Sequence, residues 1–442
     1  MLIKIEHSKP FAKIHNISLT LRNNGFFHII ISSSLVKIVS FISAIFLPRF
    51  LTKTDYGLLT YVDNIRNYIL LINGIGISNA TLRYCAKQDT DENKKGYFIA
   101  SLIVGVLFDF ILIAASIIAF LMIPFSFNGA KSLLLLMSFL PLFAFLLDDI
   151  QLLLRACFEN KKYSVLSFLY SALMVVLQIG FAVLWRLNGI VLARYLALIL
   201  CIAVGAIYIR NIKTICAKAV IPHKDEIIGM LKFGIVMLAA NATSLVMQLN
   251  ETFIIGQVLK DEAALADYKV ASYILSISLF LLQSVIIFVF PYFVKHMDDR
   301  QWIWGKFKKL FYINAVIMIP VHIVLILFSK PIILVVFGEN YLNAVPIMQM
   351  LLVASLGQAL FRGLTGNILA GIGEEKYNLN INIIFTVLHA AIDIWAVKTF
   401  GLNGAAVALT VVYFASGIVM VIHLRNVCRD KARGGKPNIK TT

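Results

Sequence analysis

Long apolar segments recur from residue 26 almost to the end of the chain. A helix needs about 20 apolar residues to cross the roughly 30 Å hydrocarbon core of a bilayer, and about twelve segments meet that requirement. They lie near residues 26–48, 57–80, 97–123, 131–154, 163–186, 189–209, 229–254, 268–290, 309–328, 345–370, 377–397 and 404–424. No interval between them could hold a soluble domain. The pattern predicts an all-α integral membrane protein with about twelve transmembrane helices.

The composition of the 442-residue chain agrees with this prediction. Hydrophobic residues make up 60% and charged residues 14%, and the mean hydropathy is +0.86, whereas soluble domains are nearer half apolar and a quarter charged. The five cysteines show neither CxxC nor zinc-ligand spacing. The sequence motifs of zinc proteases, serine hydrolases and P-loop proteins are absent. We therefore predict a transporter without catalytic residues, metal or cofactor, rather than an enzyme.

The basic residues are distributed between the apolar segments, which accounts for the net charge of +17. When the amino terminus is placed in the cytoplasm, about 28 lysine and arginine residues fall on the inner side and about 8 on the outer side. Short loops rich in lysine and arginine stay in the cytoplasm. We therefore expect both termini to be cytoplasmic, and the charge does not indicate a nucleic-acid partner.

Matching sequences at matching spacing indicate an internal repeat. Leu187-Asn188-Gly189 and Leu402-Asn403-Gly404 precede the sixth and twelfth segments, and Asp55-Tyr56 with Tyr61 corresponds to Asp267-Tyr268 with Tyr273. Six spans in each repeat give both halves the same orientation, and we expect a central cavity between the halves. The predicted regions are a cytoplasmic leader without signal-peptide features (1–25), an amino-terminal half (26–215), a cytoplasmic linker (216–226), a carboxyl-terminal half (227–426) and a basic cytoplasmic tail (427–442).

Ionisable and amide side chains inside the apolar segments are the candidate functional residues, because a charge in a membrane must face protein or water. We expect the basic residues to attract an anionic group and the amides beside them to contact the substrate. The predicted substrate-binding residues are Lys37, Arg66, Asn67, Asn73, Gln358 and Arg362. The candidates for carrying a coupling ion are Asp63, Asp109, Asp148, Asp149, His389 and Asp393.

The same residues have a structural interpretation, in which they form interhelical hydrogen bonds and ion pairs that hold the helices together. Asp63 with Arg66 is one such candidate pair. Arg194 and Glu251 lie near span ends, where we expect them to reach water. These two residues are therefore expected to have no role in transport.

Three local sequences resemble a known family. Arg49 to Gly57 resembles the R-x-L-x-x-x-x-Y-G signature of Wzx-type O-antigen and polysaccharide repeat-unit flippases, which belong to the MOP flippase superfamily together with MATE transporters. Phe337 to Ala344 resembles their F-G-x-x-Y-x-x-A turn, and Gly401 to Ala406 resembles the entry to their last span. The sequence around Glu251 departs from the family pattern, in which an acidic residue directly precedes x-x-I-I-G.

The resemblance implies a two-half, MATE-like fold around a central cavity, in the bacterial inner membrane. It also implies the substrate, an undecaprenyl-pyrophosphate-linked oligosaccharide that is flipped from the cytoplasmic to the periplasmic leaflet by alternating access. A cavity lined by cations suits a pyrophosphate. Besides the lipid bilayer, the implied partners are a polysaccharide polymerase and a chain-length regulator.

Other transporters remain alternatives. A MATE-like, cation-coupled multidrug exporter shares the fold but needs an acidic cavity for cationic substrates, and a lipid II flippase usually has two further spans. A major-facilitator transporter would carry a G-x-x-x-D-R-x-G-R-R loop where this chain reads Arg83 to Gln88. A membrane-embedded polymerase or ligase would need a long outer loop with catalytic residues, and no outer loop here is long.

Overall fold

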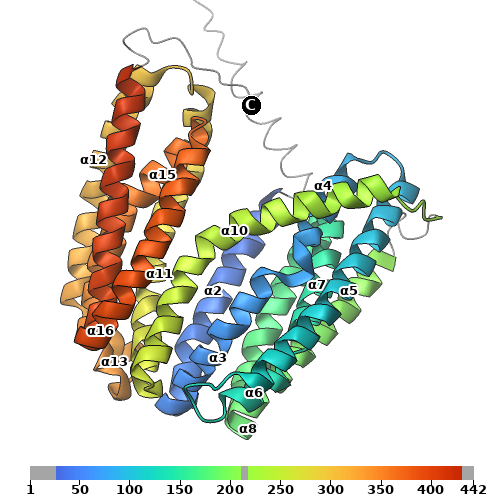
Figure 1. The fold of residues 1–442 in the computed structure, drawn as a ribbon, viewed down its shortest axis with the longest axis horizontal. Helices are drawn as coiled ribbons and strands as arrows, with labels where there is room; N and C mark the ends of the chain where they lie inside the picture. Colours follow the sequence, from blue (N-terminus) through green and yellow to red (C-terminus); the bar gives the residue numbers. More distant parts are fainter. Residues whose placement is uncertain (1–25, 211–217, 431–442) are drawn as a thin grey trace, which may run out of the picture. The chain divides into compact units, whose positions relative to one another are not determined.

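The computed structural model describes residues 26–210 and 218–430. The predicted leader (1–25), residues 211–217 and the final part of the predicted tail (431–442) lie outside the described residues. Within the described ranges every regular element is a helix, which confirms the predicted fold class. Figure 1 shows these helices running side by side as long rods within each part of the molecule.

The described part of the chain before residue 211 forms seven α-helices and one 3₁₀ turn. They are α2 (Phe26–Phe50), α3 (Lys53–Leu71), η1 (Asn73–Gly76), α4 (Ile77–Lys87), α5 (Asp91–Met122), α6 (Ala130–Leu136), α7 (Leu140–Ala156) and α8 (Asn160–Arg210). The turn η1 separates α3 from α4, so the second apolar segment is an interrupted helix.

The described part after residue 217 has the following elements. They are α10 (Lys224–Leu259), α11 (Glu262–Lys295), α12 (Arg300–Leu327), α13 (Ser329–Val336), η2 (Glu339–Tyr341), α14 (Ala344–Gly357), η3 (Gln358–Arg362), α15 (Gly363–Gly371) and α16 (Glu375–Asp430). The short element η3 is a π-helical turn between α14 and α15.

The longest helices, α8 and α16, are each broken at one point. At 1.5 Å per residue, 51 and 56 residues would extend for about 77 and 84 Å, far beyond one bilayer crossing. The breaks lie at Arg186, with φ 48° and ψ −129°, and at Gly401, with φ 61° and ψ −142°. Each break therefore separates two predicted spans.

The two breaks are the same turn built twice. Arg186 and Gly401 immediately precede the repeated Leu-Asn-Gly sequences. A Cβ on Gly189 would lie 2.0 Å from the carbonyl oxygen of Phe181, and a Cβ on Gly404 would lie 2.0 Å from that of Ala396. Only glycine allows this approach of the two backbones, so the sequence repeat has a repeated structural cause.

Several helices have the length and apolarity of membrane spans. Among the described residues, five helices satisfy both criteria, and a sixth span results if α6 and α7, which meet at 41°, count as one bent crossing. The helices α8 and α16 are among the five. The chain is therefore a multi-pass membrane protein, and the number twelve stays a prediction.

The chain divides into two compact units. Unit 1 comprises residues 1–51, 66–125 and 131–241, and unit 2 comprises residues 52–65, 126–130 and 242–442, as far as these are described. Unit 2 has a large apolar core from α11, α12, α15 and α16 that includes Phe293, Phe307 and Leu364. The boundaries cut α3 after Ile65 and α10 after Asn241, so both helices contribute to both units.

Candidate functional site

In unit 1, an interrupted helix holds one of the predicted carboxylates. Gly74, Ile75 and Gly76 have φ values of 54°, 51° and 73°, which stop the helical hydrogen bonding between α3 and α4. Asp109 of α5 is fully buried, and its Oδ1 accepts a hydrogen bond from the Gly74 amide at 2.8 Å. Non-helical backbone at membrane depth needs such a partner. The structure thus brings Asp109 to the turn that contains Asn73.

A second buried carboxylate in unit 1 joins three helices. Asp149 of α7 is fully buried, and its Oδ1 accepts hydrogen bonds from Thr81 of α4 at 2.7 Å and from Ser101 of α5 at 3.0 Å. Its neighbour Asp148 is exposed. Both acids are predicted candidates; in the structure Asp149 has donors on two other helices, whereas Asp148 has one, the hydroxyl of Ser78 on α4.

The predicted cations of unit 1 lie on α2 and α3. Lys37 of α2 is exposed, and Arg66 of α3 is partly buried, with its Nη2 3.5 Å from Oδ1 of Asn67. Arg66 and Arg194 of α8 both lie close enough to Tyr170 to interact electrostatically with its hydroxyl. Unit 1 therefore gathers two guanidinium groups around one tyrosine.

The expectation that Arg194 reaches water is wrong. Its exposed fraction is 4%, and its Nη1 lies 3.6 Å from Sδ of Met137. The residue follows the turn at Arg186 by two helical turns, and in the sequence this position looks like a span end. In the structure α7 and α8 pack along each other, which covers it.

In unit 2, the π-helical turn η3 presents Arg362 to three other side chains. Its Nη2 donates to Oδ1 of Asn382 at 2.9 Å, its Nη1 lies 3.2 Å from Sδ of Met247, and its guanidinium stacks 5.1 Å from the ring centre of Tyr413. A Cβ on Gly417 of α16 would lie 2.7 Å from the backbone nitrogen of Arg362. This close approach of α16 fixes the position of the turn, and π-helical turns often occur at functional sites.

The predicted polar face of α16 is present and partly buried. Thr386 donates to the Asn382 carbonyl at 2.7 Å, and Asn382 donates to Asn378 at 3.3 Å. His389 and Asp393 are fully buried one helical turn apart. Among the described residues, neither ring nitrogen of His389 and neither carboxylate oxygen of Asp393 has a hydrogen-bond partner. Burying such groups without partners is costly unless they are neutral or paired.

Glu251 of α10 joins this group, which contradicts the expectation that it is solvated. Its exposed fraction is 6%, and it interacts electrostatically with Asp393 and with the hydroxyl of Tyr268. A signal was available in the sequence, because Glu251 lies one helical turn after Met247 within an apolar stretch of α10. We call the set Glu251, Arg362, His389 and Asp393 the unit 2 cluster.

Two predicted residues, Asp63 and Gln358, remain to be placed. Asp63 lies in the part of α3 that belongs to unit 2 and interacts electrostatically with Tyr56. Gln358 begins η3 and is partly buried. The described ranges contain no group of three or more histidine, cysteine and acidic side chains arranged to bind a metal.

Comparison with known proteins places these features in a family context. A sequence model described as "polysaccharide biosynthesis protein" matches residues 46–346, more than half of the chain. The uncharacterized membrane protein MJ1068 of Methanocaldococcus jannaschii is 24% identical over 434 residues, covering 90% of this chain and 83% of that protein. The lipopolysaccharide biosynthesis protein WzxC of Escherichia coli K12 is 26% identical over 134 residues, covering 30% of this chain and 26% of that protein.

Solved structures share the fold across nearly the whole chain. The inward-facing conformation of a multidrug resistance MATE family transporter of the MOP superfamily matches with a TM-score of 0.73 and 14% identity, covering 91% of this chain and 96% of that one. The lipid II flippase MurJ in an inward closed conformation matches with a TM-score of 0.66 and 18% identity, covering 89% and 87%. At these identities the likeness establishes the fold.

Proposed function

The chain belongs to the polysaccharide biosynthesis protein family and has the fold of MOP-superfamily transporters; from this premise we propose that it flips undecaprenyl-pyrophosphate-linked oligosaccharide repeat units. The direction is from the cytoplasmic to the outer leaflet of the bacterial inner membrane, by alternating access. The transported units are used to build O-antigen or another surface polysaccharide. The polysaccharide polymerase and the chain-length regulator are partners that act after the transporter. The termini are cytoplasmic in this proposal.

The observation that carries the proposal is a partly buried guanidinium that is held in place and that has no salt bridge to any residue the structure describes. Arg362 is fixed by Asn382, Met247 and the ring of Tyr413, all uncharged groups. A guanidinium has five N–H donors, more than these contacts use. Its planar fork matches a phosphate oxygen pair. The other residues predicted to contact the substrate are two cations, Lys37 and Arg66, and the amides of Asn67, Asn73 and Gln358, which suit sugar hydroxyls.

The coupling ion in this proposal is a proton carried by the unit 2 cluster. Asp393 and Glu251 interact with each other, and two nearby buried carboxylates cannot both be charged without a large penalty. Gain or loss of one proton therefore changes the net charge next to Arg362 and changes how strongly that arginine holds an anion. Asp63, Asp109, Asp148 and Asp149 are the remaining candidates for proton carriage.

A MATE-like multidrug exporter is the competing function, because one solved relative of this fold is named as a multidrug resistance transporter. The two functions predict opposite needs at the site. A cationic drug requires net negative charge, whereas a pyrophosphate requires the positive charge of Arg362 and Arg66. Removal of the cations therefore distinguishes them.

The test combines a gene deletion in the host with charge-removing variants. We expect the deletion to trap lipid-linked repeat units in the inner leaflet and to abolish surface polysaccharide. Arg362→Ala, Arg66→Ala and Lys37→Ala at matched expression should reproduce the defect. Lys398→Ala, an exposed lysine on α16, is the matched control and should restore polysaccharide fully. Normal polysaccharide in the deletion strain, with increased sensitivity to cationic dyes, would instead establish the exporter.

A further inference from the structure

A segment of the amino-terminal half belongs to unit 2. Residues 52–65, the beginning of the second predicted span, and residues 126–130 group with residues 242–430. The rest of α3 groups with unit 1. The contacts that attach residues 52–65 to the carboxyl-terminal half are therefore informative, because they join parts of the two sequence repeats.

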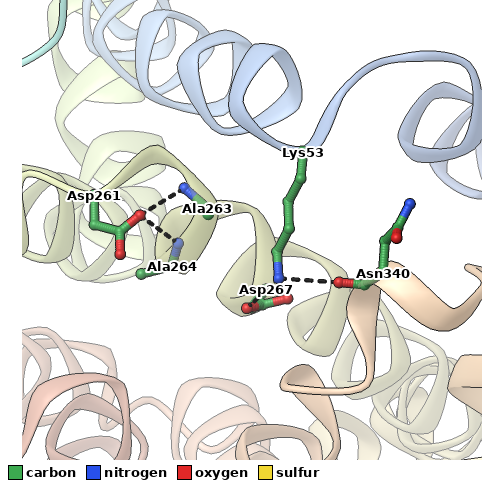
Figure 2. A network of polar contacts seen from close by, with 6 residues as sticks. All are labelled: Lys53, Asp261, Ala263, Ala264, Asp267 and Asn340. Carbon is green, nitrogen blue, oxygen red and sulfur yellow. Dashed lines mark hydrogen bonds and ion pairs between the residues drawn. The ribbon is translucent and has the colours of Figure 1, made fainter.

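The first contact is an ionic one, which Figure 2 shows in close view. Lys53 extends from the start of α3, and its Nζ lies 2.7 Å from Oδ2 of Asp267 on α11. The same Nζ donates to the carbonyl oxygen of Asn340 at 3.0 Å. It also lies 5.6 Å from the ring centre of Tyr341. One lysine thus connects α3, α11 and the turn η2.

The second contact is a hydrogen bond between two tyrosines, one from each half of the sequence. Tyr56 donates its hydroxyl to that of Tyr273 at 3.0 Å. The adjacent backbones touch, since a Cβ on Gly57 would lie 1.8 Å from the carbonyl oxygen of Glu262. Asp261 accepts hydrogen bonds from the amides of Ala263 and Ala264, which caps the start of α11 (Figure 2).

A third contact lies further along α3. Gln257 of α10 donates to the Tyr61 hydroxyl at 2.7 Å and accepts from Ser126 at 2.8 Å. Asn64 donates to the Leu249 carbonyl at 3.0 Å. The row of contacts along residues 53–64 is therefore polar at Lys53, Gln257 and Asn64, while Leu59 and Val62 between them are buried apolar residues.

We propose that Lys53, Tyr56, Asp267 and Tyr273, with the Asn340 carbonyl, form a releasable lock at the outer end of the transporter. We call this set the outer lock. It is closed in this structure, and it opens when the outer leaflet becomes accessible, so that residues 52–65 leave the carboxyl-terminal half. The inference rests on the proposed alternating access, and the positive-inside pattern assigns Lys53 and Lys260 to the outer side.

The ionic and hydroxyl contacts of the outer lock are the ones that water can replace when the outer side opens. The Lys53 and Asp267 side chains are 20% and 6% exposed, so water can replace the ionic contact as it separates. A single hydroxyl bond such as that between Tyr56 and Tyr273 contributes only about 0.5–1.5 kcal/mol of net stability, because water replaces it when the two hydroxyls separate. The proposal also gives one physical role to two of the sequence motifs. Lys53 and Tyr56 lie in the R-x-L-x-x-x-x-Y-G motif, and Asn340 and Tyr341 lie in the F-G-x-x-Y-x-x-A motif.

The decisive experiment is a reversible cross-link across the outer lock. The five native cysteines are replaced by serine or alanine, and Lys53→Cys is combined with Asp267→Cys. A short bifunctional methanethiosulfonate then joins the two thiols. We expect the cross-link to stop transport almost completely and a reductant to restore it. Transport at an unchanged rate in the fully cross-linked protein would overturn the outer lock.

A matched control places both cysteines on one helix. Lys330→Cys with Leu334→Cys lies on α13, where both side chains are exposed. The same reagent should leave transport unchanged in this variant.

The second measurement exchanges the charges of the ion pair. Lys53→Asp and Asp267→Lys should each lower the transport rate several-fold, and the double variant should recover most of that rate.

A readout that does not depend on the substrate separates this proposal from the proposed function. Gln257→Cys places a single thiol next to the outer lock in the cysteine-free protein. We expect a membrane-impermeant maleimide to label it faster in Lys53→Ala than in the parent. Faster labelling without a polysaccharide defect would refute the flippase function and retain the outer lock. A polysaccharide defect in the deletion strain, with equal labelling in both proteins, would do the reverse.

Discussion

The two units treat their buried carboxylates differently. In unit 1, Asp109 accepts from a backbone amide and Asp149 accepts from two hydroxyls. In unit 2, neither carboxylate oxygen of Asp393 has a hydrogen-bond partner among the described residues, whereas Glu251 of α10 accepts from Tyr268 of α11. Asp109, Asp149 and Glu251 therefore connect helices, whereas Asp393 brings no hydrogen bond to the fold.

This difference indicates that the acids of unit 1 and Asp393 of unit 2 have different roles. Asp109 supplies an acceptor to an amide that the broken helix between α3 and α4 leaves free, and Asp149 ties α7 to α4 and α5. Removing them should damage folding. Asp393 makes no such hydrogen bond, so under the proposed function we expect it to carry the proton that binds and leaves during transport.

The strongest test of this comparison is Asp393→Asn. The amide keeps the size of the side chain but cannot release a proton, so we expect near-complete loss of proton-dependent flipping with little change in thermal stability. Measurement requires transport of lipid-linked repeat units into proteoliposomes with and without a pH gradient, beside thermal denaturation in detergent. Full transport with a normal response to the pH gradient would show that the unit 2 cluster does not carry the coupling proton.

The converse test is Asp149→Ala in unit 1. Loss of the carboxylate leaves the buried hydroxyls of Thr81 and Ser101 without their acceptor, which should destabilise the protein by about 1–3 kcal/mol. Asp148→Ala is the matched control and should destabilise the protein less, because that neighbour is exposed and loses a single hydroxyl donor, that of Ser78. Thermal denaturation of both purified variants measures the difference. Equal stability of the two variants would contradict a structural role for Asp149.

The sequence predicted the fold more fully than the site. Apolar length predicts the helices and the Leu-Asn-Gly repeat predicts the two matching turns, because both depend on local chemistry. The partners of Asp149 come from helices far apart in sequence, so spacing along one helix could not separate Asp149 from Asp148. The burial of Glu251 and Arg194 likewise depends on neighbouring helices. Tertiary packing therefore decided which polar residues have partners.

The paired turns give a third test, because one has arginine where the other has glycine. A non-glycine residue with positive φ is strained by about 1–3 kcal/mol. Arg186→Gly should therefore raise stability, and Gly401→Ala should lower it by about 1–2 kcal/mol. Thermal denaturation measures both effects. If Arg186→Gly destabilises the protein, the arginine side chain makes a contact that outweighs the strain, and the two turns differ in more than sequence.

The smallest effect is expected where the linker meets unit 1. The Tyr97 hydroxyl donates to Oε1 of Glu226 at 2.6 Å, and the His223 amide donates to Oε2 at 2.8 Å. The Val220 carbonyl also packs directly on Gly96, where a Cβ would lie 1.7 Å from its oxygen. These contacts attach the start of α10 to unit 1, as the outer lock attaches residues 52–65 to unit 2.

Glu226→Gln should loosen this attachment and increase tryptic cleavage after Lys218 and Lys224 modestly at neutral pH. Hydrogen bonds from the Tyr97 hydroxyl and from the His223 amide lower the pKa of Glu226 from its ordinary value of 4.5. A lowered pKa means that the stabilisation is fully present above pH 4.5 and is lost as the pH falls through the lowered value. The difference from the parent should therefore disappear in acid, as judged by a protease active there. Asp225→Asn, an exposed neighbour, should cleave like the parent, and equal cleavage of Glu226→Gln would show that Gly96 and Val220 hold the linker alone.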